Sequence, residues 1–180
     1  MQKVIVVLPT YNEAENLPHM LPTLLDLPVE GLEVLVVDDN SPDGSGEIAE
    51  AFAREAAGRI QVLHRPGKEG LGVAYKEGLR AALTQGADLI IQMDCDFSHP
   101  PEKLPEMVAQ AATHDLVIGS RYVAGGSTSE EWGLWRKLLS LWANRIYIGL
   151  ILHTRTRDAT AGFRVWRRAA LQSIDLDLIR

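Results

Sequence analysis

The chain has 180 residues, about the length of one domain, and it is 46% hydrophobic and 23% charged. This balance is typical of a folded globular protein and excludes a disordered chain, a collagen-like chain and a disulfide scaffold. A single cysteine, Cys95, excludes an intrachain disulfide and a cysteine-rich zinc site and fits a reducing cytosol, and the formal net charge of −6 argues against nucleic acid as a partner.

Five apolar segments predict β-strands, and four of them are unbroken runs rich in valine and isoleucine, a pattern typical of strands covered on both faces. Stretches with helical periodicity lie between them. In chain order the expected elements are strand Lys3–Leu8, helix Ala14–Leu27, strand Glu33–Asp38, helix Gly46–Ala56, strand Ile60–Leu63, helix Gly72–Gln85, strand Asp88–Asp94, helix Pro100–Thr113 and strand Asp115–Ser120. This alternation predicts an α/β fold with a Rossmann-like, mostly parallel sheet and helices on both faces.

The pattern changes after a loop at Gly125–Ser129. Leu134–Leu152 is a stretch of 19 residues with three cations and no acid. A central Arg or Lys costs about 2.5 to 3.5 kcal/mol in lipid, so this stretch predicts an amphipathic helix at a membrane surface rather than a span. The alternative is a helix packed against the domain's own sheet. We therefore divide the chain into a core, residues 1–125, and a membrane-surface segment of the same domain, residues 126–180.

Charge is distributed unevenly between these two parts. Trp132–Arg168 contains eight Lys or Arg residues and one acid, Asp158, which gives this segment a net charge of +7. The rest of the chain must then carry −13. Such an asymmetry predicts that the basic segment meets an anionic partner.

Polar residues follow four of the expected strands, where ligands bind in an open parallel sheet. Helix capping and turn formation also explain such residues one cluster at a time. The clusters are Pro9–Glu13, Asp38–Ser41, Asp94–Asp96 and Ser120–Tyr122.

Asp94 and Asp96 carry the most specific signal, because they flank Cys95 directly after an apolar strand. In an extended segment, residues two apart face the same way, so both carboxylates can address one cation. Hard oxygen ligands favour Mg²⁺ or Mn²⁺, which would in turn bind a diphosphate. Asp39 is placed to accept hydrogen bonds from a ribose or a base.

The glycine-rich stretch RPGKEGLGVAY contains the cations Arg65 and Lys68 and is similar to a dinucleotide fingerprint. However, Tyr75 stands at the place of the third glycine, and the stretch follows the third strand, so a nicotinamide or flavin enzyme is disfavoured. Nucleophilic catalysis has little support: the chain has no G-x-S-x-G, and the acids beside Cys95 would raise the pKa of its thiol. We interpret His64 and His99 as structural or surface residues.

Six runs of residues together resemble family 2 glycosyltransferases, and within them the dolichyl-phosphate (polyprenyl-phosphate) mannose synthases. They occur in the order found in that family and cover almost the whole chain. The runs are PTYNE at Pro9–Glu13, VVDDNSPDG at Val36–Gly44, GKEGLGVAYKEG at Gly67–Gly78, MDCDFSHPPE at Met93–Glu102, GSRYVAGG at Gly119–Gly126 and DATAGFR at Asp158–Arg164.

The resemblance implies a GT-A fold and metal-dependent, inverting transfer of mannose from GDP-mannose to a polyprenyl (dolichyl-type) phosphate. It implies a catalytic set of Asp96, Arg121 and Arg136. It also implies a guanosine pocket of Pro9, Tyr11, Glu13, Val37 and Asp39, with the cation Lys68 in the substrate-binding set; a diphosphate site of Asp94, Cys95 and Asp96; metal ligands Asp94, Asp96 and Ser98; and an acceptor-phosphate site of Arg121, Arg136 and Ser140.

Members of this family continue beyond the position of Arg180. We therefore expect either a missing C-terminal segment or a separate membrane subunit to complete the site, and we expect a cytoplasmic protein peripheral to the cytoplasmic face of the membrane. Two alternatives stay open. One is another lipid-phosphate or glycan glycosyltransferase, for example with a UDP-glucose donor, and the other is a non-catalytic nucleotide-binding module.

Overall fold

The computed structural model describes residues 2–120, 158 and 161–178. Residues 2–117 and 163–178 belong to one compact unit. The expected basic helix Leu134–Leu152 lies outside the described residues, as do Arg121, Arg136 and Ser140. None of the helices in the described ranges is both long enough and apolar enough to cross a membrane.

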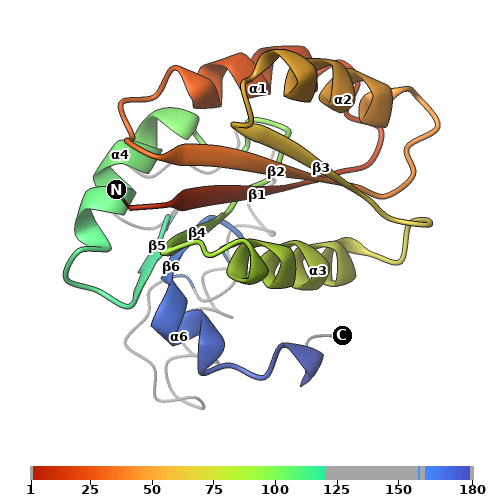
Figure 1. The fold of residues 1–180 in the computed structure, drawn as a ribbon. Coiled ribbons are helices and arrows are strands. Elements are labelled where there is room, and N and C mark those ends of the chain that lie inside the picture. The colour runs from red at the N-terminus through yellow and green to blue at the C-terminus, as the bar shows by residue number, and fades with distance from the viewer. Residues whose placement is uncertain (1, 121–157, 159–160, 179–180) are drawn as a thin grey trace, which may run out of the picture. The chain divides into compact units, whose positions relative to one another are not determined.

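Within these ranges, six strands form one sheet in the order β3-β2-β1-β4-β6-β5. Helices and strands alternate along the chain as the sequence predicts (Figure 1). The elements are β1 (Val4–Thr10), α1 (Leu17–Leu25), β2 (Leu32–Asp38), α2 (Ser45–Glu55), β3 (Ile60–His64), α3 (Leu71–Thr84), β4 (Leu89–Gln92), the 3-10 turn η1 (Pro101–Lys103), α4 (Leu104–Gln110), β5 (Leu116–Ile118), β6 (Arg164–Arg167), α6 (Arg168–Gln172) and the 3-10 turn η3 (Leu176–Leu178).

Strands β1, β2, β3 and β4 pair in parallel, which confirms the mostly parallel sheet. The exception is β6, which the sequence analysis missed. It runs antiparallel to β4, with Ile90 opposite Trp166, and separates β4 from β5. Its sequence is RVWR, with only Val165 and Trp166 buried, so it is too short and too polar at its ends to stand out as an apolar run.

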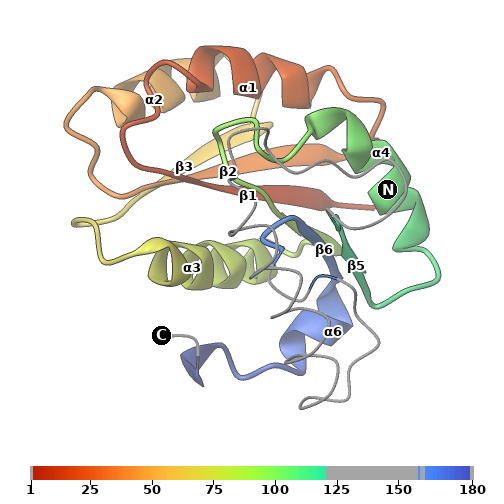
Figure 2. The ribbon, with the colours of Figure 1, turned by 180° about the vertical axis from the view of Figure 1, so that it is seen from behind.

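The core has two layers, one on each face of the sheet. Every residue of β1 is buried. Val4, Val6 and Leu8 pack on the face that carries α1, α2 and α4, whereas Ile5 and Val7 pack on the face that carries α3 and α6. Figure 2 shows α1 and α2 on one side of the sheet and α3 and α6 on the other. Each fully buried aliphatic side chain contributes about 1.5 to 3 kcal/mol, so this double burial explains the unbroken apolar runs.

Three expected boundaries are wrong by a few residues. Helix α1 begins at Leu17, because residues 13–16 form a turn in which the amide of Asn16 donates to the carbonyl oxygen of Glu13. The expected helix Pro100–Thr113 is split into η1 and α4. The strand expected at Asp88–Asp94 is paired only at Leu89–Gln92, so the residues that follow Gln92 are free to form a bent loop.

Candidate active site

The parallel strands β1, β2 and β4 are neighbours, so their carboxyl ends meet at one edge of the sheet. Thr10 is in register with Asp38 at the ends of β1 and β2, and the amide of Asp39 donates to the carbonyl oxygen of Thr10 over 3.0 Å. The polar clusters that follow these strands are thereby brought to a common edge, as the sequence predicts.

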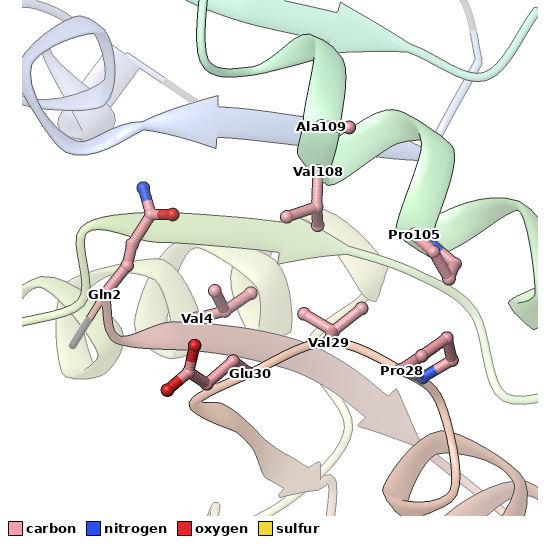
Figure 3. Close-up of a pocket in the computed structure, with 8 residues that line it drawn as sticks. All are labelled: Gln2, Val4, Pro28, Val29, Glu30, Pro105, Val108 and Ala109. Carbon is pink, nitrogen blue, oxygen red and sulfur yellow. The ribbon is translucent and has the colours of Figure 1, made fainter.

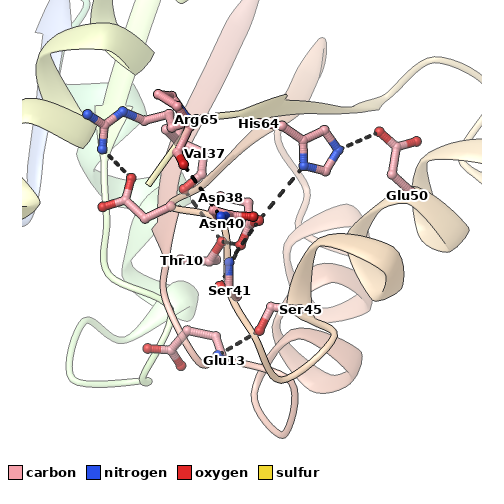
Figure 4. Close-up of polar contacts among 12 residues, drawn as sticks. Thr10, Glu13, Val37, Asp38, Asn40, Ser41, Ser45, Glu50, His64 and Arg65 are labelled. Carbon is pink, nitrogen blue, oxygen red and sulfur yellow. Dashed lines mark hydrogen bonds and ion pairs between the residues drawn. The ribbon is translucent and has the colours of Figure 1, made fainter. Parts of the chain in front are cut away.

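Side chains of the loop after β2 hold the loop after β1. Three successive amides of the first loop, at residues 12–14, donate to Ser41 Oγ over 3.2 Å, Ser45 Oγ over 2.8 Å and Asp43 Oδ2 over 3.0 Å. The Ser45 hydroxyl in turn donates to Asp43 Oδ1 over 2.6 Å (Figure 4 shows Ser45 and Glu13). These hydrogen bonds fix the backbone that presents Tyr11 and Glu13.

Hydrogen bonding also perturbs the acid in this arrangement. The Ser45 hydroxyl above all, assisted by the amides of Ala14 and Ser45, lowers the pKa of Asp43 below its ordinary value, although burial opposes the shift. Asp43 therefore acts as a structural carboxylate at the start of α2, where a negative charge is also favoured by the helix dipole.

Two adjacent acids at the end of β2 have different surroundings. Asp38 is buried and accepts hydrogen bonds from the Ser41 hydroxyl over 2.6 Å and from the Thr10 hydroxyl over 3.4 Å, and it lies 3.8 Å from His64 Nδ1 (Figure 4). Asp39 points to Arg65 instead. Asp38 thus serves the turn, while Asp39 is part of an ionic cluster.

Arg65 is the centre of that cluster, and its side chain is only 1% exposed. Besides Asp39, it contacts Glu77 on α3 over 2.9 Å and Glu69 over 3.1 Å. Burial opposes the charge on Arg65, but hydrogen bonds and charge from Glu77 and Asp39 outweigh it and raise the pKa of the guanidinium. A buried cation with several carboxylate partners is satisfied electrostatically and stays charged.

The loop after β4 carries Asp94, Cys95 and Asp96, and it is bent rather than extended. The expectation that this segment is extended is therefore wrong, whereas the prediction that both acids address one cation stays a prediction. The bend is stabilised by hydrogen bonds from the Asp94 amide to His99 Nδ1 over 3.0 Å and from the Ser98 amide to Asp96 Oδ1 over 3.0 Å, and Phe97 takes a left-handed φ of 59°. His99 itself stacks on Phe163, with ring centroids 5.1 Å apart.

Tyr75 on α3 reaches this loop. Its hydroxyl donates to Asp94 Oδ1 over 2.6 Å. Burial first, and then the charges of Asp94 and Asp96, raise the pKa of Tyr75 far above its ordinary value, so the hydroxyl keeps its proton. Both carboxylates therefore lie close enough to the hydroxyl to act on it electrostatically.

Cys95 faces away from this edge, into the core on the α1 side of the sheet, and is 1% exposed. Burial first, and then the charges of Glu13, Asp96 and Asp94, raise the pKa of its thiol. The sequence analysis predicted this direction from the two flanking acids. Glu13 and the Asp94–Asp96 loop thus concentrate negative charge around the same point.

The remaining expected site residues that the structure describes have fewer side-chain contacts with the acids at this edge. Pro9 and Val37 are buried, and the side chain of Val37 belongs to the core beneath α3. Lys68 is exposed and lies over the ring of Tyr11, 3.8 Å from its centroid. Ser98 is exposed, and the contact that the structure gives it is through its amide. Arg121, Arg136 and Ser140 lie outside the described residues.

Sequence reasoning missed the functions of Arg65 and Tyr75 in the site. The signals were present: Arg65 directly follows β3, and Tyr75 replaces a glycine at a position that faces the sheet. The sequence pattern did not reveal their partners, because Asp39 is 26 residues from Arg65 and Asp94 is 19 residues from Tyr75.

A pocket of about 280 Å³ lies elsewhere, at the start of β1 rather than at its end (Figure 3). Prolines and valines make up much of its wall, and the charge comes from Glu30. Its lining residues are Gln2, Val4, Pro28, Val29, Glu30, Pro105, Val108 and Ala109.

The sequence model of the family described as Glycosyl transferase family 2 matches residues 5–175. Among curated proteins, the chain is 46% identical over 98% of its length to an undecaprenyl-phosphate mannosyltransferase of Micrococcus luteus. It is 41% identical over 99% to a polyprenol monophosphomannose synthase of Mycolicibacterium smegmatis, and 36% identical over 98% to a dolichol-phosphate mannosyltransferase of Pyrococcus furiosus. The chain spans 71%, 66% and 49% of the lengths of these three relatives.

Solved structures give the same picture at the level of the fold. A mannosyltransferase of Pyrobaculum calidifontis in complex with GDP-Man and Mn²⁺ matches with a TM-score of 0.63 at 20% identity, over 95% of this chain and 46% of that one. A glucosyl-3-phosphoglycerate synthase of Mycobacterium tuberculosis in complex with Mn²⁺, UDP and phosphoglyceric acid matches with a TM-score of 0.62 at 25% identity, over 93% of this chain and 56% of that one.

Proposed function

The chain belongs to glycosyl transferase family 2 and has the GT-A fold, and on that premise we propose that it transfers mannose, with inversion, from GDP-mannose to a polyprenyl phosphate. The observation that carries the proposal is the similarity, at 36% to 46% identity over nearly the whole chain, to three hexosyltransferases that are each named for mannose and a polyprenyl phosphate.

Asp39, Tyr11 and Glu13 are the side chains best placed to receive the nucleoside. They lie at the joined ends of β1 and β2, on loops fixed by hydrogen bonds between them. The ion pair with Arg65 orients the side chain of Asp39, and in this proposal the carboxylate accepts hydrogen bonds from a ribose or a base. Pro9 and Val37 are buried near the ends of the same two strands, and the proposal keeps them in the nucleoside site.

The residues of the Asp94–Asp96 loop fit a divalent cation. They offer hard carboxylate oxygens, Asp96 is exposed and Asp94 is 32% exposed, and the negative charge gathered there calls for a counter-charge. Within the described residues, no group of three or more His, Cys, Asp or Glu could enclose an ion. Asp94 and Asp96, with Ser98 as a further oxygen donor, would hold Mg²⁺ or Mn²⁺, which would supply charge neutralisation to the leaving diphosphate.

The acceptor explains why a general base is not required. A phosphate monoester has a second pKa of about 6, so it is already largely dianionic at neutral pH and is itself the nucleophile. Catalysis then rests on aligning two anions and relieving their repulsion. We assign that function to Arg121, Arg136 and Ser140, and we propose that the basic stretch Leu134–Leu152 holds the protein at the surface of a membrane that contains the lipid.

We also propose that residues 1–125 bind the nucleotide sugar and that residues 126–180 bind the acceptor as part of the same domain. The placement of β6 supports a single domain, because these residues of the second part pair with β4 of the first part. The loop after β4 carries the proposed cation site, so β6 of the second part pairs with the strand that directly precedes this site.

The test is transfer of radiolabelled mannose from GDP-mannose to a polyprenyl phosphate in detergent, with Mg²⁺ or Mn²⁺ and then with EDTA. We expect a lipid-extractable product that depends on the metal. A panel with UDP-glucose in place of GDP-mannose checks the donor. Product formed only from the UDP sugar would contradict the mannose assignment, and metal-dependent binding of GDP without any transfer would contradict the catalytic one.

A further inference from the structure

We propose that Tyr75 is a positioning residue that orients the Asp94 carboxylate and thereby sets the affinity of the site for its divalent cation. This inference rests on the proposed function, because it takes Asp94 as a ligand of that cation. It adds a residue of α3 to a site otherwise built from loops that follow strands.

The contact itself is short and shielded from solvent. The Tyr75 hydroxyl donates to Asp94 Oδ1 over 2.6 Å, and Tyr75 is only 7% exposed. A hydrogen bond from a hydroxyl to a carboxylate at this distance is a strong, charge-assisted one. It occupies one oxygen of Asp94 and leaves Oδ2, which is 3.7 Å from His99 Nδ1, as the oxygen to face a cation.

The loop's own hydrogen bonds do not perform this function. The Asp94 amide donates to His99 Nδ1, and the Ser98 amide donates to Asp96 Oδ1, so these contacts fix the backbone of the loop and the side chain of Asp96. The side chain of Asp94 is instead anchored from α3, through Tyr75. A carboxylate held in one rotamer before the cation arrives loses less entropy on binding it.

Helix α3 is a rigid support for this anchor. Tyr75 and Gly78 are three residues apart and share a face of the helix. A Cβ atom at Gly78 would lie 2.4 Å from Val7 Cγ1 and 2.9 Å from Val37 Cγ2, so the helix backbone rests directly on β1 and β2. Packing of α3 in the core therefore fixes the position of the Tyr75 hydroxyl, and through this hydroxyl it fixes the orientation of the Asp94 carboxylate.

The test compares Tyr75→Phe with the unaltered protein in titrations with Mn²⁺ in the presence of GDP, with free Mn²⁺ followed by electron paramagnetic resonance. Tyr75→Phe keeps the ring and removes only the hydroxyl. Loss of a group that orients a metal ligand weakens metal binding by about 10- to 100-fold, and we expect a loss in that range. Trp166→Phe is the matched control, since it removes another buried hydrogen bond, from Trp166 Nε1 to Gln92 Oε1 over 2.5 Å, that lies in β4 and β6 rather than at the acids.

A second pair of variants shows whether Tyr75 acts through Asp94. In a double-mutant cycle, Asp94→Asn and Asp94→Asn with Tyr75→Phe should bind Mn²⁺ equally weakly. An unchanged Mn²⁺ affinity in Tyr75→Phe, or an equal loss in Trp166→Phe, overturns the inference while leaving the proposed function standing. Absence of Mn²⁺ binding by the unaltered protein overturns both, and thermal unfolding of each variant confirms that it is folded.

Discussion

Acidic residues at the carboxyl edge of the sheet divide into two kinds according to their partners. Asp38 and Asp43 accept hydrogen bonds from hydroxyls and amides of the same two loops, so their charge is used to hold the turn. Asp96 is exposed and accepts a hydrogen bond from the neighbouring amide of Ser98. An exposed carboxylate at this edge contributes little to stability and is available to a ligand.

This difference predicts the outcome of Asp96→Ala. We expect mannose transfer to be abolished, because the cation loses a ligand. We expect the melting temperature to change no more than it does for a neutral substitution on the surface. The measurements are the radiolabel assay and thermal unfolding monitored by circular dichroism. Full transfer activity in this variant would contradict the assignment of Asp96 to the cation.

Arg65 shows the opposite case, a charged residue whose removal should affect the fold. Arg65→Met leaves Asp39, whose side chain is 6% exposed, buried without its counter-charge, and breaking a buried ion pair in this way costs about 3 to 5 kcal/mol. Urea unfolding measures the change in free energy. Arg80→Met is the control: Arg80 pairs with Asp177 at 44% and 74% side-chain exposure, and solvent screens such a pair, so we expect little change in the free energy of unfolding. An equal loss of unfolding free energy in both variants would show that the buried Arg65 cluster stabilises the fold no more than an exposed ion pair does.

At the scale of elements, the alternating strands and helices were predictable. Burial on both faces of a parallel sheet requires unbroken apolar runs in the strands, and these runs are visible in the sequence. β1 is the clearest case, with seven buried residues in succession. β6 was not predictable, because it has only two buried residues and its place in the sheet depends on pairing with the distant strand β4. Trp166 of β6 donates a hydrogen bond to Gln92 of β4, which is 74 residues away in the sequence. The same reason applies to the site: local patterns identified Asp94 and Asp96, and only the fold could supply Tyr75.

The hydrogen bonds between the two loops at the start of α2 predict how the stability of the protein depends on pH. The folded state lowers the pKa of Asp43, chiefly through the Ser45 hydroxyl, so folding favours the carboxylate over the acid. The stability that Asp43 contributes is therefore fully present above its ordinary pKa of 3.8 and is lost as the pH falls through the lower folded value.

Asp43→Asn should accordingly unfold at a lower temperature than the unaltered protein at pH 7, and the gap between the two should close as the pH falls below about 4. Thermal unfolding in a series of buffers from pH 7 to strongly acid conditions gives the comparison. A gap that stays constant over this range would mean that the charge of Asp43 does not hold the loops together.

At the scale of the whole molecule, charge is distributed unevenly between the parts that we propose for the donor, residues 1–125, and for the acceptor, residues 126–180. The described part of the site gathers Glu13, Asp94 and Asp96, and its buried cation Arg65 is already paired with acids. The basic segment 132–168 carries a net charge of +7, so in our proposal it supplies the cations that attract a lipid phosphate. Of that segment, Arg168 is committed to the carbonyl oxygens of residues 83 and 87. Arg136 lies earlier in the same segment and is one of the cations that we propose for the acceptor.

Arg136→Ala tests this separation of charge. If Arg136 holds the acceptor phosphate, its loss removes a charge-assisted hydrogen bond worth about 1.5 to 3 kcal/mol, which corresponds to a rise in KM for polyprenyl phosphate on the order of 10- to 100-fold. KM for GDP-mannose should change little, because the proposal assigns the nucleotide to residues 1–125 and not to Arg136. Lys137→Ala removes the same charge from the neighbouring position and is the matched control. A rise in KM confined to GDP-mannose, or an equal rise for the lipid in both variants, would show that Arg136 adds only to a general attraction between the basic segment and an anionic surface.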